Sequence, residues 1–107
     1  MSFSIEIEPL VYEDLSAVCT WYEDKIENLG DRFAEQFFSA VSSLDLYPAA
    51  NPLFQPLASF GVRHRLVGVF PYSIYFRILG EKVVVHLLYH GARSPRALRR
   101  ALTRRLP

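Results

Sequence analysis

Residues 62–78, VRHRLVGVFPYSIYFRI, predict a β-hairpin, because two runs rich in β-branched and aromatic residues flank a turn region at Phe70-Pro71-Tyr72. The same hairpin carries three arginines and a histidine. That is more positive charge than a small sheet needs for solubility. The stretch therefore predicts a sheet, and it raises the question of what the charge on that sheet does.

Two further strands are predicted, one after this hairpin in the sequence and one near the N-terminus. Gly80-Glu81 forms a tight turn, and the nearly continuous apolar run 82–90 that follows is typical of an interior strand. Near the N-terminus, residues 3–8 alternate between apolar and polar side chains, which indicates a strand with one wet face. The sheet is therefore expected to contain four strands.

Two helices are predicted between the first strand and the hairpin. Pro9 suits a first helical turn, Gly30 is expected to end the first helix, and Asp31 is expected to cap the second. Apolar residues recur at three- and four-residue steps in both segments. The first stripe is Val11, Leu15, Val18, Tyr22, Ile26 and Leu29, and the second is Phe33, Phe37, Ala40, Val41, Leu44 and Tyr47. Two such helices joined through one glycine indicate an αα-hairpin, which Pro48 ends.

The remaining segments are a proline-containing loop over 48–60 and a short basic helix that opens at Ser94-Pro95. Leu98 and Leu102 lie on one side of this helix and favour its docking on the core. The order is β-α-α-β-β-β with a short C-terminal helix. It predicts an α+β fold with a mostly antiparallel sheet, the αα-hairpin packed on one face and the other face free.

Length and composition predict one domain over residues 1–107 that buries its own core. The single cysteine, Cys19, excludes an intramolecular disulfide and favours a reducing compartment. The N-terminus resembles no signal peptide, and no apolar run approaches about 20 residues. A cytoplasmic protein with no membrane partner is therefore expected.

The net charge of +1 hides a strong asymmetry between the two halves of the chain. Residues 1–60 hold 2 basic and 10 acidic side chains, whereas residues 61–107 hold 10 basic and 1 acidic. One interpretation is a dipolar domain whose halves lie against each other. The other is a basic working surface for an anionic partner, built on an acidic scaffold.

Strand alternation predicts where that basic surface lies. Tyr75 and Arg77 share one face of their strand, and Arg63 and Arg65 share a face of theirs. If the registers agree, these side chains gather on the free sheet face, where arginine forks and an aromatic ring suit phosphate and nucleobase contacts. The predicted target-binding surface comprises Arg63, Arg65, Tyr75, Arg77, Arg93, Arg99 and Arg100, with His90 near it. The alternative is an ordinary solvated sheet face.

The sequence predicts no metal site and no cofactor. His86 and His90 lie about 13 Å apart on an extended strand, too far to share one zinc ion. No Ser-His-Asp arrangement and no glycine-rich phosphate loop occurs. A metal-free ribonuclease is a physical alternative, with His90 as general base or acid and Arg63, Arg65 and Arg77 holding the phosphate.

Several motifs together resemble the RelE/ParE superfamily, the toxins of bacterial type II toxin–antitoxin, or plasmid-stabilisation, modules. They occur in order over nearly the whole chain: WYE at 21–23, LGDRF at 29–33, YP at 47–48, VR at 62–63, FPYSIYFR at 70–77 and HGARSP at 90–95. The resemblance implies two helices on a small antiparallel sheet, the same fold that the residue patterns indicate.

Within the superfamily the chain is more similar to ParE-like members. RelE-like members typically carry lysines on the free sheet face and a catalytic Tyr or His near the C-terminus. Here the strands hold only Lys82, and the tail 102–107 has no aromatic residue. The resemblance therefore implies a toxin that binds and poisons DNA gyrase and inhibits growth. It also implies neutralisation by a cognate antitoxin, for which the charge asymmetry predicts an acidic, amphipathic toxin-binding segment. The alternatives are a RelE-like ribosome-dependent mRNA endoribonuclease and a non-toxic regulatory member.

Overall fold

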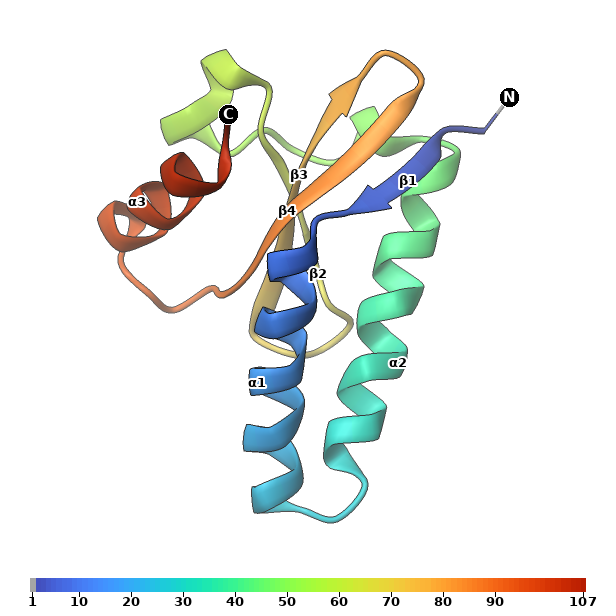
Figure 1. The fold of residues 1–107 in the computed structure, drawn as a ribbon, viewed down its shortest axis with the longest axis vertical. Coiled ribbons are helices and arrows are strands. Elements are labelled where there is room, and N and C mark those ends of the chain that lie inside the picture. The colour runs from blue at the N-terminus through green and yellow to red at the C-terminus, as the bar shows by residue number, and fades with distance from the viewer. Residues whose placement is uncertain (1) are drawn as a thin grey trace.

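Four strands form one mixed sheet in the order β1–β4–β3–β2 in the computed structural model, which describes residues 2–107 (Figure 1). β1 runs parallel to β4, and the two remaining neighbour pairs are antiparallel. The strands are β1 Ser4–Ile7, β2 Arg63–Leu66, β3 Tyr72–Leu79 and β4 Lys82–His90. β4 lies between β1 and β3, which confirms that the apolar run 82–90 is an interior strand.

Two helices, α1 Pro9–Lys25 and α2 Leu29–Ser42, form the predicted αα-hairpin on one side of the sheet (Figure 1). Three short 3₁₀ segments, Ser43–Asp45, Pro48–Ala50 and Gln55–Phe60, occupy the stretch from α2 to β2. The last helix, α3 Pro95–Arg105, follows β4 and packs on the opposite side of the sheet from the αα-hairpin. The α+β prediction is confirmed. No helix within residues 2–107 is long and apolar enough to cross a membrane.

The main core lies between the αα-hairpin and the sheet. Both predicted helical stripes face it, and most of their members are buried because the sheet covers them: Val11, Leu15, Val18, Phe33, Phe37, Ala40, Val41 and Leu44. Two members of the predicted stripes are exposed: Ile26, near the end of the first stripe, is 62% exposed, and Tyr47, the last member of the second, is 76% exposed. Each lies beyond the end of its helix, at Lys25 and Ser42, so the helical periodicity no longer directs it inward.

The predicted role of Gly30 as a helix terminator is wrong, because Gly30 lies in the first turn of α2. The chain instead reverses at Asn28, whose φ is +69°. A Cβ on Gly30 would lie 2.5 Å from the carbonyl oxygen of Cys19, so the glycine permits close approach of the two helices. The Glu23 carboxylate accepts hydrogen bonds from the backbone N–H groups of Asn28 and Gly30, at 2.8 and 2.9 Å, and this carboxylate caps α2 in place of Asp31.

The second sheet face is covered, so the expectation that it is free is wrong. A second core comprises Leu57, Val62, Tyr75, Leu87, Leu98 and Leu102. Leu98 and Leu102 come from α3 and are buried, which confirms that the C-terminal helix docks on the domain. The physical reason lies in β4, which is apolar on both faces and therefore needs cover on both.

Candidate functional site

The strand register separates the arginines that were expected to act together. Arg63 pairs with Phe76 across β2 and β3, and directly paired residues project from the same face. Phe76 belongs to the main core, so Arg63 projects from the helix-covered face, as does Arg65 two residues on. Arg77 follows Phe76 and projects from the opposite face. The prediction that Arg63, Arg65 and Arg77 cluster on one face is therefore wrong.

Arg63 and Arg65 bind the segment that follows α2. Nη1 of Arg63 donates to the carbonyl oxygens of Asn51 at 2.6 Å and Ala49 at 3.2 Å. Nη1 of Arg65 donates to Oδ1 of Asn51 at 3.2 Å, and the Asn51 amide donates to the carbonyl of Pro48. These bonds hold residues 48–51 against the edge strand β2. The two guanidinium groups thus have a structural role, which was not predicted from the sequence.

Tyr75 is not available as a contact residue for a target. Its side chain is only 4% exposed and belongs to the second core. The ring stacks on His64 at 5.7 Å between centroids and meets Phe54 edge-on at 5.6 Å. Burial raises the pKa of the Tyr75 hydroxyl. The prediction that this ring lies on the exposed binding surface is wrong, because α3 and the segment 55–60 cover that face.

Arg77 contacts His86 on the second face of the sheet. The register of β3 and β4 shifts between Tyr75 and Phe76, and this bulge leaves His86 without a paired residue. Nε of Arg77 donates to Nε2 of His86 at 3.1 Å, so the neutral imidazole carries its proton on Nδ1. Nδ1 lies 2.7 Å from Oε1 of Glu8, but this contact lacks good hydrogen-bond geometry, and within residues 2–107 Nδ1 has no other partner.

Burial is the main influence on His86 and lowers the pKa of its imidazole. The nearby Arg77 guanidinium lowers that pKa further, whereas the Glu8 and Glu6 carboxylates act in the opposite direction. The net direction is downward. His86 is therefore held neutral, which keeps Nε2 free to accept the hydrogen bond from Arg77.

A cleft of about 330 Å³ lies between α1 and the end of β4, and it brings two of the sequence motifs together. His90 and Arg93 line it from one side, and Trp21 and Asp14 line it from α1. Nδ1 of His90 accepts the backbone N–H of Ala92 at 2.9 Å, which places the proton of the neutral ring on Nε2. The cleft therefore combines an imidazole, a guanidinium, a carboxylate and aromatic rings.

Besides Trp21 of α1, the cleft is lined by two tyrosine rings, one from β3 and one from β4. Tyr72 meets the His90 ring edge-on at 4.9 Å between centroids. The Arg93 guanidinium lies 5.4 Å from the centre of the Tyr89 ring, within cation–π range. Sequence analysis placed His90 and Arg93 near the basic surface but did not assign Trp21, Tyr72, Tyr89 or Asp14 to the site. The WYE and HGARSP motifs were the available signals, yet only the fold shows that they meet.

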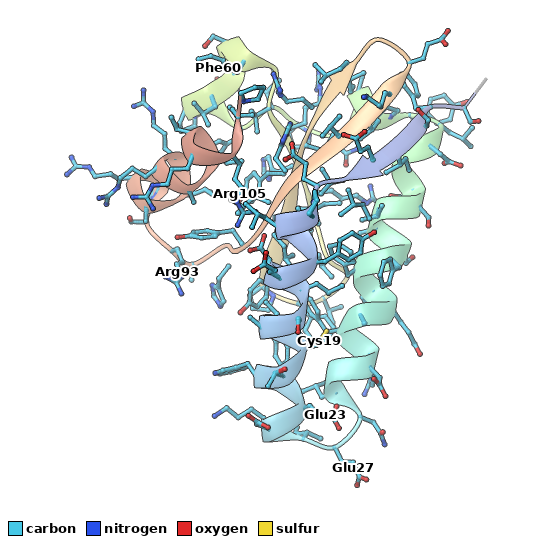
Figure 2. All side chains as sticks on the ribbon, in the orientation of Figure 1. Cys19, Glu23, Glu27, Phe60, Arg93 and Arg105 are labelled. Carbon is cyan, nitrogen blue, oxygen red and sulfur yellow. The ribbon has the colours of Figure 1, made fainter. Side chains whose placement is uncertain are left out.

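The last group of predicted residues lies on α3. Arg99 and Arg100 are exposed, as are Arg96 and Arg104. Figure 2 shows nitrogen-tipped side chains that project from α3 away from the sheet. The predicted basic residues thus occupy three separate places: the β2 edge, the second sheet face at Arg77, and the region of α3 with Arg93. Within residues 2–107, no three His, Cys, Asp or Glu side chains lie close enough to hold a metal ion.

Comparison with known proteins identifies a solved structure with a similar fold. The sequence matches no protein-family model and no curated protein. Seven chains of solved structures do match. One is a chain of the chromosomal ParDE toxin–antitoxin system from P. aeruginosa, with a TM-score of 0.70, 19% sequence identity, and coverage of 82% of this chain and 95% of that chain. This chain therefore has the fold of a chain of that ParDE system, and the predicted fold is confirmed.

Proposed function

We propose that this chain is the ParE-like toxin of a type II toxin–antitoxin system, and that it binds and poisons DNA gyrase. The observation that carries the proposal is the likeness in fold to a chain of a ParDE system over nearly the whole of that chain. The motifs that span residues 21–95 support the same assignment. The finer statement, gyrase as the target, follows from the greater resemblance to ParE-like members.

The placement of the arginines favours binding over catalysis. A metal-free ribonuclease needs its cations and its acid–base group around one phosphate. Arg63 is engaged with the carbonyls of Ala49 and Asn51, and Arg77 lies on the opposite face beside His86. His90 lies in the cleft between α1 and the end of β4. Arg63, Arg77 and His90 do not surround one substrate position, so the proposed action is a protein contact.

The cognate antitoxin is expected to offer an acidic, amphipathic segment. Besides its net positive charge, the C-terminal half exposes apolar side chains at and beyond the end of β2: Leu66, its last residue, is 61% exposed, and Val69 is 97% exposed. Arg65 lies beside Leu66 and is exposed at this edge, where its guanidinium also donates to Asn51. An incoming segment with alternating acidic and apolar residues matches both features. This neutralising contact is part of the proposal.

Induced expression in bacteria tests the proposal first. The expected result is growth arrest that co-expression of the antitoxin relieves, together with loss of supercoiled plasmid in the arrested cells. Growth at the normal rate with abundant folded protein would contradict the toxin assignment and would instead fit a non-toxic regulatory member.

The cleft between α1 and the end of β4 favours a second candidate, an mRNA endoribonuclease. Nε2 of His90 is positioned to exchange a proton, and Arg93 lies beside it as a phosphate contact. Mapping of mRNA ends after induction distinguishes this candidate. Codon-phased cuts that disappear in His90→Ala and Arg93→Ala, but persist in Arg63→Ala, would favour the enzyme. Intact transcripts in growth-arrested cells would reject it.

A further inference from the structure

The outer face of α3 carries four arginines that have no acidic partner within residues 2–107. Arg96, Arg99, Arg100 and Arg104 are exposed and line, with Thr103, a shallow hollow of about 560 Å³. The ion pairs found in residues 2–107 are Lys82–Glu6, His86–Glu8 and Arg105–Asp14, and none includes these four residues. The face is therefore a patch of uncompensated positive charge.

The spacing turns this patch into an ordered row. Arg96, Arg100 and Arg104 recur every fourth residue, so they lie along one side of the helix in steps of about 6 Å. Like charges at this spacing repel one another and weaken the isolated helix. The fold nevertheless holds the helix in place, because Leu98 and Leu102 are buried and Arg105 is bound to Asp14. A row of this kind is suited to an anion with regularly repeated charge.

The surroundings of the row indicate which polyanion it fits. The two leucines of α3, Leu98 and Leu102, are buried. None of the large exposed apolar residues of the described chain belongs to α3. A folded protein partner normally needs an apolar centre in the interface, whereas phosphate recognition does not. The helix also contains no aromatic residue on which bases of a single strand would stack.

The shape of the row favours B-form DNA over duplex RNA. An α-helix fits the wide major groove of B-form DNA, with its cationic side chains toward the flanking phosphates. The major groove of A-form RNA is too deep and narrow for it. α3 consists of Pro, Arg, Ala, Leu and Thr only, so the amide side chains that read adenine are missing.

We propose that α3 binds duplex DNA through the phosphate backbone, with little selectivity for base sequence. The interaction goes beyond the proposed function, because it is a direct contact with nucleic acid and does not require gyrase. In cells it would keep the protein close to chromosomal or plasmid DNA. Phosphate contacts alone produce binding that weakens steeply with salt.

The test is a titration of the full chain with a fluorescent random-sequence DNA duplex between about 50 and 200 mM salt. We expect the logarithm of the binding constant to fall linearly with the logarithm of salt concentration. In Arg96→Gln/Arg100→Gln the slope should fall by roughly 2, and affinity near 0.1 M salt should fall roughly 60-fold, since each phosphate contact contributes about 0.9 to the slope.

A matched control removes two positive charges elsewhere. Lys25→Gln/Arg32→Gln alters the exposed end of the αα-hairpin, at the end of α1 and the start of α2, and is expected to keep the affinity within about twofold, because phosphate contacts act locally. Should the α3 variant fail to fold, Arg99→Gln/Arg104→Gln supplies a second pair on the same face. Undetectable binding at low salt, equal losses in the control, or tighter binding to an RNA duplex would each overturn the proposal. Gyrase inhibition that persists without DNA binding would overturn this inference alone.

Discussion

Arg105 and Asp14, 91 residues apart in the chain, form a two-pronged ion pair that joins the last helix to the first. Nη1 of Arg105 donates to Oδ2 of Asp14 at 2.9 Å, and Nη2 donates to Oδ1 at 3.0 Å. Nη1 also donates to the carbonyl of His86, and Oδ2 accepts the N–H of Leu88. The hydrogen bonds to Asp14 raise the pKa of the Arg105 guanidinium. Figure 2 shows Arg105 between α3 and the start of α1.

This ion pair predicts that Arg105→Met destabilises the protein. The substitution removes two charge-assisted hydrogen bonds and leaves the Asp14 carboxylate with the Leu88 N–H as its remaining partner. We expect the free energy of unfolding to fall by about 1–3 kcal/mol, since both side chains are mostly shielded from water. Urea denaturation measures the change. Arg104→Met is the matched control and should stay within about 0.5 kcal/mol, because Arg104 is exposed and unpaired in the described chain. Equal effects at the two positions would contradict the role given to the ion pair.

The buried His86 is expected to make the protein less stable at acid pH. Because burial lowers the pKa of His86 in the folded chain below its ordinary value of about 6.5, the unfolded chain binds more protons between the two values. The free energy of unfolding should therefore decrease as pH falls through about 6.5, by at most about 1.4 kcal/mol per pH unit for this group. Burial of His64 lowers its pKa and acts in the same direction.

Denaturation curves recorded from about pH 7.5 to about pH 5 check this dependence. His86→Gln keeps an acceptor for Arg77 but does not titrate, so its stability should vary less with pH than that of the parent chain. The same slope in both proteins would show that His86 is not the group that titrates.

The addition of one methyl group at Gly30 is expected to lower the stability of the protein. Alanine is the better helix former, but its Cβ would lie 2.5 Å from the carbonyl oxygen of Cys19, a backbone atom that cannot rotate away. We expect Gly30→Ala to lower the free energy of unfolding by about 1–3 kcal/mol through separation of α1 from α2. In Gly91→Ala the nearest atom is the Pro71 carbonyl oxygen at 3.6 Å, so thermal unfolding should barely change. A stabilised Gly30→Ala would contradict the close approach of the helices.

The elements of this fold follow from local patterns, which is why they could be predicted. The apolar stripes that begin at Val11 and at Phe33 specify the two helices, and the apolar run of β4 specifies a central strand. The face that each strand presents could not be predicted, because an offset of one residue moves every side chain to the other face. The separation of Arg63 from Arg77 and the bulge at His86 both depend on such offsets.

The candidate site depends on contacts between distant segments, so the sequence indicated its parts but not their assembly. His90 and Arg93 were identified, yet Trp21 joins them only because α1 lies beside the end of β4. The opposite charges of the two halves of the chain are consistent with the Arg105–Asp14 pair. Nothing local distinguishes Arg105 from Arg104, because the choice depends on which side of α3 faces the domain.

A supercoiling assay with purified gyrase tests whether this protein poisons the enzyme. Relaxed plasmid, ATP and gyrase are incubated with the purified full chain, and the DNA products are separated after detergent treatment. We expect supercoiling to be lost, linear DNA to accumulate from trapped cleavage complexes, and added antitoxin to restore gyrase activity. If expression of the protein arrests growth but a large molar excess of the purified protein leaves supercoiling complete, gyrase is not the target.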